Sequence, residues 1–228
     1  MTNRLIECVP NFSEGKNTEI IHSITSEVES TQGVTLLNID PGKATNRTVV
    51  TFVGDPESVI EAAFKLIKKA SELIDMQKHQ GEHPRMGATD VCPLIPISGV
   101  SMQETIEYSL KLAEKVGNEL NIPVYLYEHS AQKKYRKNLA NIREGEYEGI
   151  ETKLMSKKWH PDYGPKQFKS IKKTGATAIG ARDFLIAYNI NLNTTSTRRA
   201  NAIAFDIREK GRIARKDNNL TGEILKDK

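Results

Sequence analysis

The sequence predicts an α+β fold in which amphipathic helices cover one sheet. Strand-like and helix-like segments alternate along the chain, and short polar turns join them. With 38% hydrophobic and 27% charged residues, the 228-residue chain has the composition of a globular protein. The first six elements follow the order strand, helix, strand, strand, helix, strand, which is that of the ferredoxin-like split βαβ unit.

Four strands and two helices make up this predicted unit. The strands are expected at Leu5–Pro10, Val34–Asp40, Arg47–Val53 and Thr89–Ile97. An apolar stripe at helical spacing between Ile20 and Val28 predicts the first helix. Asp55-Pro56-Glu57 predicts the start of the second helix, because it supplies an N-cap acceptor, a first-turn proline and an acid near the positive end of the helix dipole. Pro93 and Pro96 predict an edge position for the fourth strand, since proline cannot donate to a ladder.

Further elements extend this unit. Ser101-Met102-Gln103-Glu104 is a capping box that opens a helix running to about Leu120. A fifth strand is predicted at Ile122–Glu128, and the charged segment 131–160 is predicted to be helical. Residues 1–175 therefore form one predicted subdomain, with an extra strand and extra helices.

The start of a second α/β subdomain is predicted over residues 176–228. The preceding segment His160–Gly175 is rich in Pro, Gly and Lys, which is typical of a boundary. A strand at Asp183–Leu192 and a helix with apolar residues from Ala200 to Ile207 follow it. One strand and one helix cannot form an independent core, so this subdomain is predicted to be incomplete.

Composition argues against several protein classes. No window approaches the roughly 18 apolar residues of a membrane helix, and the N-terminus lacks the apolar core of a signal peptide. Cys8 and Cys92 lie in strand-like runs and are predicted to be buried free thiols, which favours the cytoplasm. The net charge of +4 is too small to indicate nucleic acid. We expect no nucleic-acid partner and no membrane partner.

Histidine is scarce, and His83 is the best candidate for chemistry among the five in the chain. His79 and His83 are four residues apart, as metal ligands on a helix would be. Gly81 and Pro84 predict a loop instead, and no third ligand stands nearby, so no metal is expected. A loop histidine suits general base catalysis at neutral pH. The residues fit a surface histidine without a function equally well.

Asp40 and Arg47 flank the turn predicted between the second and third strands. Asp40 could orient an imidazole, and Arg47 could hold a carboxylate through two hydrogen bonds. By themselves, a strand end and a solvated edge residue are the better interpretation. The segment Gly175–Arg182 is a weak match to a phosphate-binding loop, and the basic stretch Lys166–Lys173 is either solvated or receives an anionic tail.

Several long segments resemble glutamate formimidoyltransferases. They are Cys8–Gly15, Asp40 with Asn46–Val49, Thr51–Gly54, Gly81–Ala88 followed by Asp90–Pro93, Pro161–Pro165, Gly175–Arg182 and Ala187–Leu192. The resemblance covers nearly the whole chain in the same order. It implies two ferredoxin-like subdomains with the substrates in a basic tunnel between them. It also implies a second subdomain that continues well past Lys228, so the chain is predicted to be an incomplete enzyme.

The resemblance implies transfer of the formimino group of N-formimidoyl-L-glutamate to N5 of tetrahydrofolate, a step of histidine degradation. His83 falls on the family's catalytic histidine, and Asp40 would fix its tautomer. Tetrahydrofolate is the co-substrate, and no metal or prosthetic group is required. Both substrates carry carboxylates, which the arginines would contact. The expected substrate and folate contacts are Asn11, Arg47, Arg85, Arg182, Gly164, Pro165, Lys166, Gln167, Phe168, Lys169, Ser170, Ile171, Lys172, Lys173, Thr174 and Gly175.

Three alternatives stay open at this point. The donor could carry a formyl rather than a formimino group, or the chain could be a truncated paralogue that binds folate without full activity. A ferredoxin-like domain could also bind RNA, but the second and third strands offer only Phe52 as an aromatic platform. An exposed strand edge further predicts a homodimer.

Overall fold

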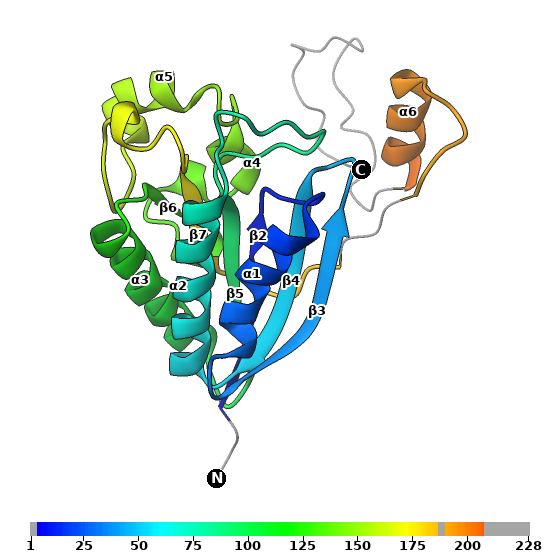
Figure 1. The fold of residues 1–228 in the computed structure, drawn as a ribbon. Helices are drawn as coiled ribbons and strands as arrows, with labels where there is room; N and C mark the ends of the chain where they lie inside the picture. The colour runs from blue at the N-terminus through cyan, green and yellow to red at the C-terminus, as the bar shows by residue number, and fades with distance from the viewer. Residues whose placement is uncertain (1–3, 187–189, 208–228) are drawn as a thin grey trace, which may run out of the picture. The chain divides into compact units, whose positions relative to one another are not determined.

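The computed structural model describes residues 4–186 and 190–207 (Figure 1). The chain divides into two compact units, Met1–Phe184 and Leu185–Lys228. The sequence predicts a boundary after residue 175, nine residues before this division. The strand Thr177–Ala181 pairs within the sheet of the first unit, so the chain leaves that unit only after this strand is complete.

One mixed sheet runs through the described part of the first unit. Its strands are β1 (Leu5–Cys8), β2 (Asn11–Phe12), β3 (Val34–Gly42), β4 (Arg47–Gly54), β5 (Thr89–Ser98), β6 (Val124–Leu126) and β7 (Thr177–Ala181). β1 and β2 follow each other in one extended segment, which pairs antiparallel with β4 and with β5. β3 extends the sheet beyond β4, and β7 then β6 extend it in parallel beyond β5. The predicted order of the first six elements is confirmed, in an α+β arrangement.

The prediction of an edge position for the strand with two prolines is wrong. β5 pairs with β1 and β2 on one side and with β7 on the other, so it lies inside the sheet. The carbonyl of Pro93 still accepts a hydrogen bond, from the Val9 N–H at 3.2 Å. A proline removes one donor and leaves the acceptor, so it is tolerated where the ladder needs only its carbonyl.

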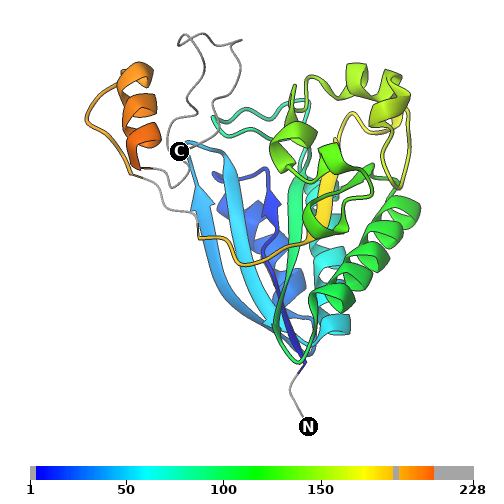
Figure 2. The ribbon, with the colours of Figure 1, turned by 180° about the vertical axis from the view of Figure 1, so that it is seen from behind.

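Three long helices lie on one face of this sheet, and Figure 2 views the sheet from behind. They are α1 (Thr18–Glu29), α2 (Pro56–Leu73) and α3 (Met102–Glu119). Both predicted helix starts are confirmed. The Asp55 side chain accepts from the Ser58 N–H at the start of α2, and Ser101 and Glu104 form a reciprocal capping box at the start of α3.

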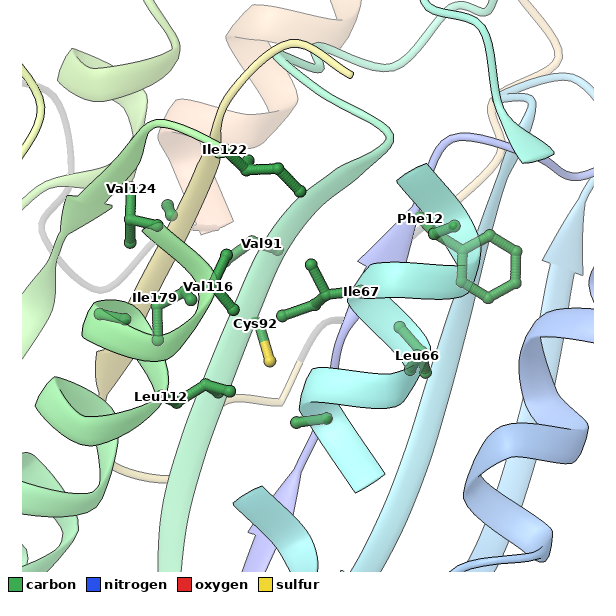
Figure 3. Close-up of a cluster of buried hydrophobic side chains, with 14 of the residues drawn as sticks. Phe12, Leu66, Ile67, Val91, Cys92, Leu112, Val116, Ile122, Val124 and Ile179 are labelled. Atoms are coloured by element: carbon green, nitrogen blue, oxygen red, sulfur yellow. The ribbon is translucent and has the colours of Figure 1, made fainter. Parts of the chain in front are cut away.

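The core fills the space between the sheet and these helices (Figure 3). Leu66 and Ile67 of α2 and Leu112 of α3 are buried in it, as is Ile179 of β7. Cys8 and Cys92 are buried free thiols, as predicted, with their sulfurs 3.5 Å apart. Continuous apolar faces on three helices and on the sheet therefore account for the stability of this unit.

The charged segment after β6 forms only short helices. They are α4 (Leu139–Arg143), α5 (Ile150–Met155) and 3-10 turns at Glu128–Ser130, Lys134–Arg136, Lys157–Trp159 and, further on, Phe168–Ser170. The fully buried side chain of Arg136 ties the segment together. It donates to Asp162 at 2.8 Å and to the His160 carbonyl at 2.6 Å, and it lies over the ring of Tyr125. The prediction that 131–160 is helical is correct only for short stretches. Polar contacts such as those of Arg136 hold this segment, and it has no continuous apolar stripe.

The described part of the second unit contains α6 (Thr197–Ile207), which confirms the predicted helix. The strand predicted at Asp183–Leu192 is absent from residues 183–186 and 190–192, and residues 187–189 lie outside the described part. The apolar side chains of Phe184, Leu185 and Ile186 are exposed. Apolar content alone suggested a strand here, but a strand also needs a neighbour for its backbone groups. Across the described residues, no helix combines the length and apolar character needed to span a membrane.

The packing generates a first prediction. Leu112→Ala removes a side chain with no exposed surface, and it should lower the free energy of unfolding by about 2–5 kcal/mol. Leu37→Ala is the matched control, because 57% of Leu37 is exposed, and its effect should stay within about 0.5 kcal/mol. Urea unfolding followed by circular dichroism measures both values. Equal losses in the two variants would contradict the proposed core.

Candidate active site

The loop between α2 and β5 carries His79, His83 and Arg85, and backbone contacts hold it on two sides. On one side, the side-chain amide of Asn46, in the β3–β4 turn, donates to the Gln80 carbonyl at 2.8 Å. On the other side, the Ala88 N–H donates to the Thr174 carbonyl at 2.8 Å. The loop is therefore a fixed part of the first unit.

His83 is held in one tautomer by its surroundings. Its Nδ1 lies 2.7 Å from the Pro84 carbonyl, which can only accept, so Nδ1 carries the proton. Its Nε2 then has the lone pair. The Nη1 of Arg47 lies 2.7 Å from Nε2 and 3.2 Å from Nδ1, so it lies against the ring and not along the lone pair of Nε2. Partial burial, and then the charge of Arg47, lower the pKa of His83. The imidazole is consequently neutral at pH 7, with Nε2 as its basic atom.

Asp90 and Arg143 form a buried ion pair beside this histidine. The Asp90 carboxylate, which has no exposed surface, accepts from both the Nε and the Nη2 of Arg143 and from the Met86 N–H. Burial lowers the pKa of Arg47, and the charge of Arg143 acts in the same direction, while Asp90 and Asp40 oppose it. Sequence reasoning assigned no role to Asp90 or Arg143. A charged residue inside an otherwise apolar strand was the one signal that could have pointed to Asp90.

Asp40 lies near Arg47 and not on the imidazole. It is exposed on β3, opposite Val49 of β4, and its charge favours the protonated form of Arg47. Among the described contacts, no hydrogen bond joins Asp40 to His83. The contact that fixes the tautomer at Nδ1 comes from the Pro84 carbonyl.

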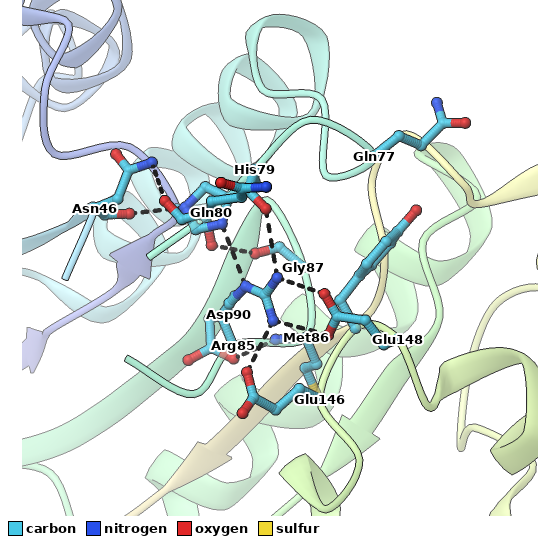
Figure 4. Close-up of polar contacts among 12 residues, drawn as sticks. Asn46, Gln77, His79, Gln80, Arg85, Met86, Gly87, Asp90, Glu146 and Glu148 are labelled. Atoms are coloured by element: carbon cyan, nitrogen blue, oxygen red, sulfur yellow. Dashed lines mark hydrogen bonds and ion pairs between the residues drawn. The ribbon is translucent and has the colours of Figure 1, made fainter. Parts of the chain in front are cut away.

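Arg85 connects the loop to the turn after α4 (Figure 4). Its Nη1 donates to Glu146 at 2.8 Å and to Glu148 at 2.9 Å, and its Nη2 donates to Glu148 at 2.7 Å. Its Nε donates to the Nδ1 of His79 at 3.2 Å, and Nη2 reaches the His79 carbonyl at 3.4 Å. These contacts use all five N–H donors of the guanidinium. Arg85, expected to contact substrate, has no donor left for it in this arrangement.

His79 completes this network. Its Nε2 lies 2.8 Å from the Asn46 carbonyl and therefore carries the proton, while its Nδ1 accepts from Arg85. Burial is the main cause that lowers the pKa of His79. His79 and Arg85 thus fix the loop on either side of His83, from the β3–β4 turn to the turn that holds Glu146 and Glu148.

The remaining predicted contacts lie on three other elements. Asn11 of β2 is buried, and its side-chain amide donates to the Val9 carbonyl at 2.9 Å. Arg182 follows β7; its backbone N–H donates to the Leu94 carbonyl, and its Nη1 is buried with no hydrogen-bond partner among the described residues. The charge of Arg182 acts on Glu7, which is on β1.

The predicted folate-contacting segment, 164–175, is exposed along much of its length. Lys166, Lys169 and Lys172 are exposed, whereas Ile171 is buried and anchors the segment. Gly175 adopts a left-handed φ of 66°, and a Cβ there would lie 2.3 Å from the Met86 carbonyl oxygen, so only glycine fits. This close approach attaches the end of the segment to the loop that carries His83. Among the described residues, no group of three or more His, Cys, Asp or Glu side chains is arranged to hold a metal.

Comparison with known proteins gives a consistent result. The model of the formiminotransferase domain, N-terminal subdomain, matches residues 5–182. The chain is 51% identical over 210 residues to a formimidoyltransferase-cyclodeaminase of Dictyostelium discoideum and 52% identical over 210 residues to that of Rattus norvegicus. Each match covers 92% of this chain and 38% of the relative. A glutamate formimidoyltransferase of Streptococcus pyogenes serotype M1 is 49% identical over 208 residues, which is 91% of this chain and 69% of that protein. The chain thus spans well under half the length of the first two relatives.

The lowered pKa of His79 generates a prediction about stability and pH. Unfolded histidine binds a proton below about pH 6.5, whereas the folded state resists protonation of His79. This stabilisation is therefore complete above about pH 6.5 and is lost as the pH falls from there through the lowered folded pKa. In His79→Gln the decline in stability between about pH 7 and pH 5 should be shallower than in wild type. His83 contributes in the same direction, so part of the decline should stay.

Urea unfolding at a series of pH values measures this effect. His22→Gln is the matched control, since His22 is exposed on α1, and its profile should follow that of wild type. A His79→Gln profile parallel to wild type would contradict the assignment of His79 as a half-buried neutral group.

Proposed function

The chain belongs to the family of the formiminotransferase domain, N-terminal subdomain, and we propose on that basis that it takes part in the transfer of a formimidoyl group from glutamate. In this reaction the formimino group of N-formimidoyl-L-glutamate moves to N5 of tetrahydrofolate, as a step of histidine degradation. One observation carries the proposal: the Nδ1 of His83 is hydrogen-bonded to the Pro84 carbonyl, which leaves Nε2 as the basic atom, and burial lowers the pKa of the ring. That is the state that a general base for an amine nucleophile needs at neutral pH.

His83 is proposed to transfer the same proton in two steps, both through its Nε2. N5 of tetrahydrofolate attacks the formimino carbon and forms a tetrahedral intermediate, while Nε2 takes the proton from N5. The imidazolium then returns that proton to the glutamate nitrogen, and the bond between this nitrogen and the former formimino carbon breaks. Nδ1 keeps its hydrogen bond to the Pro84 carbonyl in both protonation states, so the ring need not turn. Holding both substrates in place contributes much of the acceleration, roughly 7–11 kcal/mol for well-oriented reactants.

Carboxylates are the groups through which both substrates would be recognised. We assign Arg47 to the donor, because it is a half-buried cation next to the proposed base. The orphaned Nη1 of Arg182 makes that residue a second candidate. The exposed lysines of segment 164–175, Lys166, Lys169 and Lys172, suit the acidic tail of tetrahydrofolate. Arg85 enters the proposal only as the residue that positions the loop, and Asn11 as support for the strand beside it.

The finer parts of the expected architecture belong to the same proposal. The antiparallel order β5, β1 with β2, β4, β3, joined through α1 and α2, supports a ferredoxin-like core to which β7 and β6 are added. Residues from Leu185 onward would then belong to a second subdomain. The free thiols of Cys8 and Cys92, 3.5 Å apart, suit a cytoplasmic protein. A homodimer stays a prediction.

The first test of this proposal is the His83→Asn variant. It should lower kcat by about 10²–10⁴, because general base catalysis contributes that much, while the affinity for tetrahydrofolate stays within a few-fold. Formation of 5,10-methenyl-folate in the presence of added cyclodeaminase gives the rate. The thermal unfolding midpoint shows that the variant is folded. Turnover near that of wild type would remove His83 from the mechanism. Replacing the donor by N-formylglutamate in the same assay separates formimino from formyl transfer.

A second variant separates two roles for Asp40. If Asp40 acts only through its charge on Arg47, Asp40→Asn should change the KM for the donor and leave kcat within about 3-fold. If Asp40 instead moves onto the imidazole during the reaction, kcat should fall by about 10² or more and its pH profile should shift. Steady-state kinetics over a range of pH decides between these roles. We expect the first result, because the Pro84 carbonyl already occupies Nδ1.

A further inference from the structure

We propose that Arg143 is a specificity-determining residue for the donor: Arg143 and Arg47 each bind one of the two carboxylates of a glutamate derivative. This inference rests on the proposed function, since it takes His83 as the base and the donor as a glutamate derivative. It adds a second recognition residue beside the base, and it makes the pair of arginines selective for a dicarboxylate.

The guanidinium of Arg143 has a defined orientation. Arg143 is the last residue of α4, and the Nζ of Lys153 donates to the carbonyls of the two residues that flank it, Ile142 and Glu144. At the other end of the side chain, the buried carboxylate of Asp90 accepts from both Nε and Nη2. The backbone and one edge of the guanidinium are therefore fixed, which lowers the entropy that ligand binding would cost.

The opposite edge of this guanidinium keeps its donors. Asp90 takes two of the five N–H groups, and the other three, both on Nη1 and one on Nη2, form no hydrogen bond with the described residues. The Nη1–Nη2 edge has the parallel N–H groups that match one carboxylate. The side chain of Arg143 is 16% exposed, so a ligand can reach it. Arg85 differs, because its contacts use all five donors.

Arg143 and Arg47 lie close to the same imidazole. The charges of both arginines oppose protonation of His83, and the charge of Arg143 also acts on Arg47. Asp90 connects Arg143 to the loop of the base, because it also accepts from the Met86 N–H at 3.0 Å. In the donor, both carboxylates lie within a few bonds of the nitrogen that leaves. In tetrahydrofolate they lie at the far end from N5, so the donor is the substrate that these two arginines suit.

The charges of this cluster suit a dicarboxylate. Arg47 and Arg143 are cations and Asp90 is an anion, which leaves one net positive charge beside the neutral His83. Asp40 is exposed, so water and salt screen its charge. A ligand with two carboxylates and one cationic nitrogen carries one net negative charge and complements the cluster. A ligand with a single carboxylate would leave one guanidinium desolvated without an anionic partner, which is unfavourable.

Titration calorimetry of the 228-residue chain with three matched ligands tests the assignment. They are L-glutamate, L-glutamine and L-isoglutamine, which have the same carbon chain and differ only in which carboxylate is an amide. Each amide should bind about 10- to 100-fold more weakly than L-glutamate, because it loses hydrogen bonds between charged groups. We call each of these two ratios an amide penalty.

Two variants should remove one amide penalty each. Arg143→Lys keeps a cation opposite Asp90 but lacks the free edge, so the penalty of one amide should fall to within about 3-fold of unity while the other penalty stays. In Arg47→Met the opposite penalty should disappear. Lys137→Met is the matched control, because it removes an exposed cation shortly before α4, and it should keep both penalties.

A purely structural role for Arg143 gives a different result. If Arg143 only neutralises Asp90, Arg143→Lys should change the affinity for all three ligands by the same factor, and both amide penalties should stay. That result would overturn the proposal, as would loss of the same penalty in both variants. Failure of L-glutamate to bind wild type, or the absence of either penalty there, would overturn it without any variant. The thermal unfolding midpoint shows whether each variant is folded.

The transfer assay on the same preparations separates this inference from the proposed function. Turnover by wild type together with unchanged penalties in Arg143→Lys means that the assignment of Arg143 is wrong and the function stands. Penalties that divide between the two variants, without turnover by wild type, mean that the arginines recognise glutamate and that the proposed reaction is wrong for this chain.

Discussion

The buried carboxylate of Asp90 is the constraint on which the site depends. A carboxylate with no exposed surface must be paired and hydrogen-bonded, because an isolated charge in the interior costs several kcal/mol. Arg143 and the Met86 N–H supply these partners, and they bring α4 and the end of the α2–β5 loop to the same point. Once the loop ends there, His83 lies beside Arg47 and the Pro84 carbonyl meets Nδ1. The pairing of Asp90 thus explains why a loop can hold an imidazole in a defined tautomer.

How much of the fold could be predicted depended on whether the determining interactions are local. The caps at Asp55 and Ser101 were predicted correctly, because an N-cap is decided within four residues of sequence. The position of β5 was wrong, because pairing with β7 joins segments far apart in the chain. β7 itself was missed, since its small residues gave a weak strand pattern. The more apolar segment that starts at Asp183 has the stronger strand pattern, but its described residues form no strand.

The site was predictable to a similar degree. His83 and Arg47 were singled out, and the structure brings them together. Asp40 was expected on the imidazole, but a backbone carbonyl occupies that position, and no side-chain pattern encodes a carbonyl. Arg143 was missed because it lies in a segment dense with charges, where most side chains are solvated. Only the three-dimensional pairing with Asp90 distinguishes it from its neighbours.

The arginines of this unit differ in what surrounds them, and this difference matters more than their position in a motif. Arg136 is fully buried and bonded to Asp162 and to two carbonyls, so it holds the segment after β6 in place. Arg85 is saturated by two glutamates and His79, so it holds the loop. Arg47 instead lies against a neutral imidazole. A guanidinium in that state is stabilised less by its own protein than Arg85 or Arg136, and it gains more from a carboxylate ligand. Pairing therefore separates a structural arginine from a ligand-binding one where the sequence motif does not, because both types lie in segments that resemble the same family.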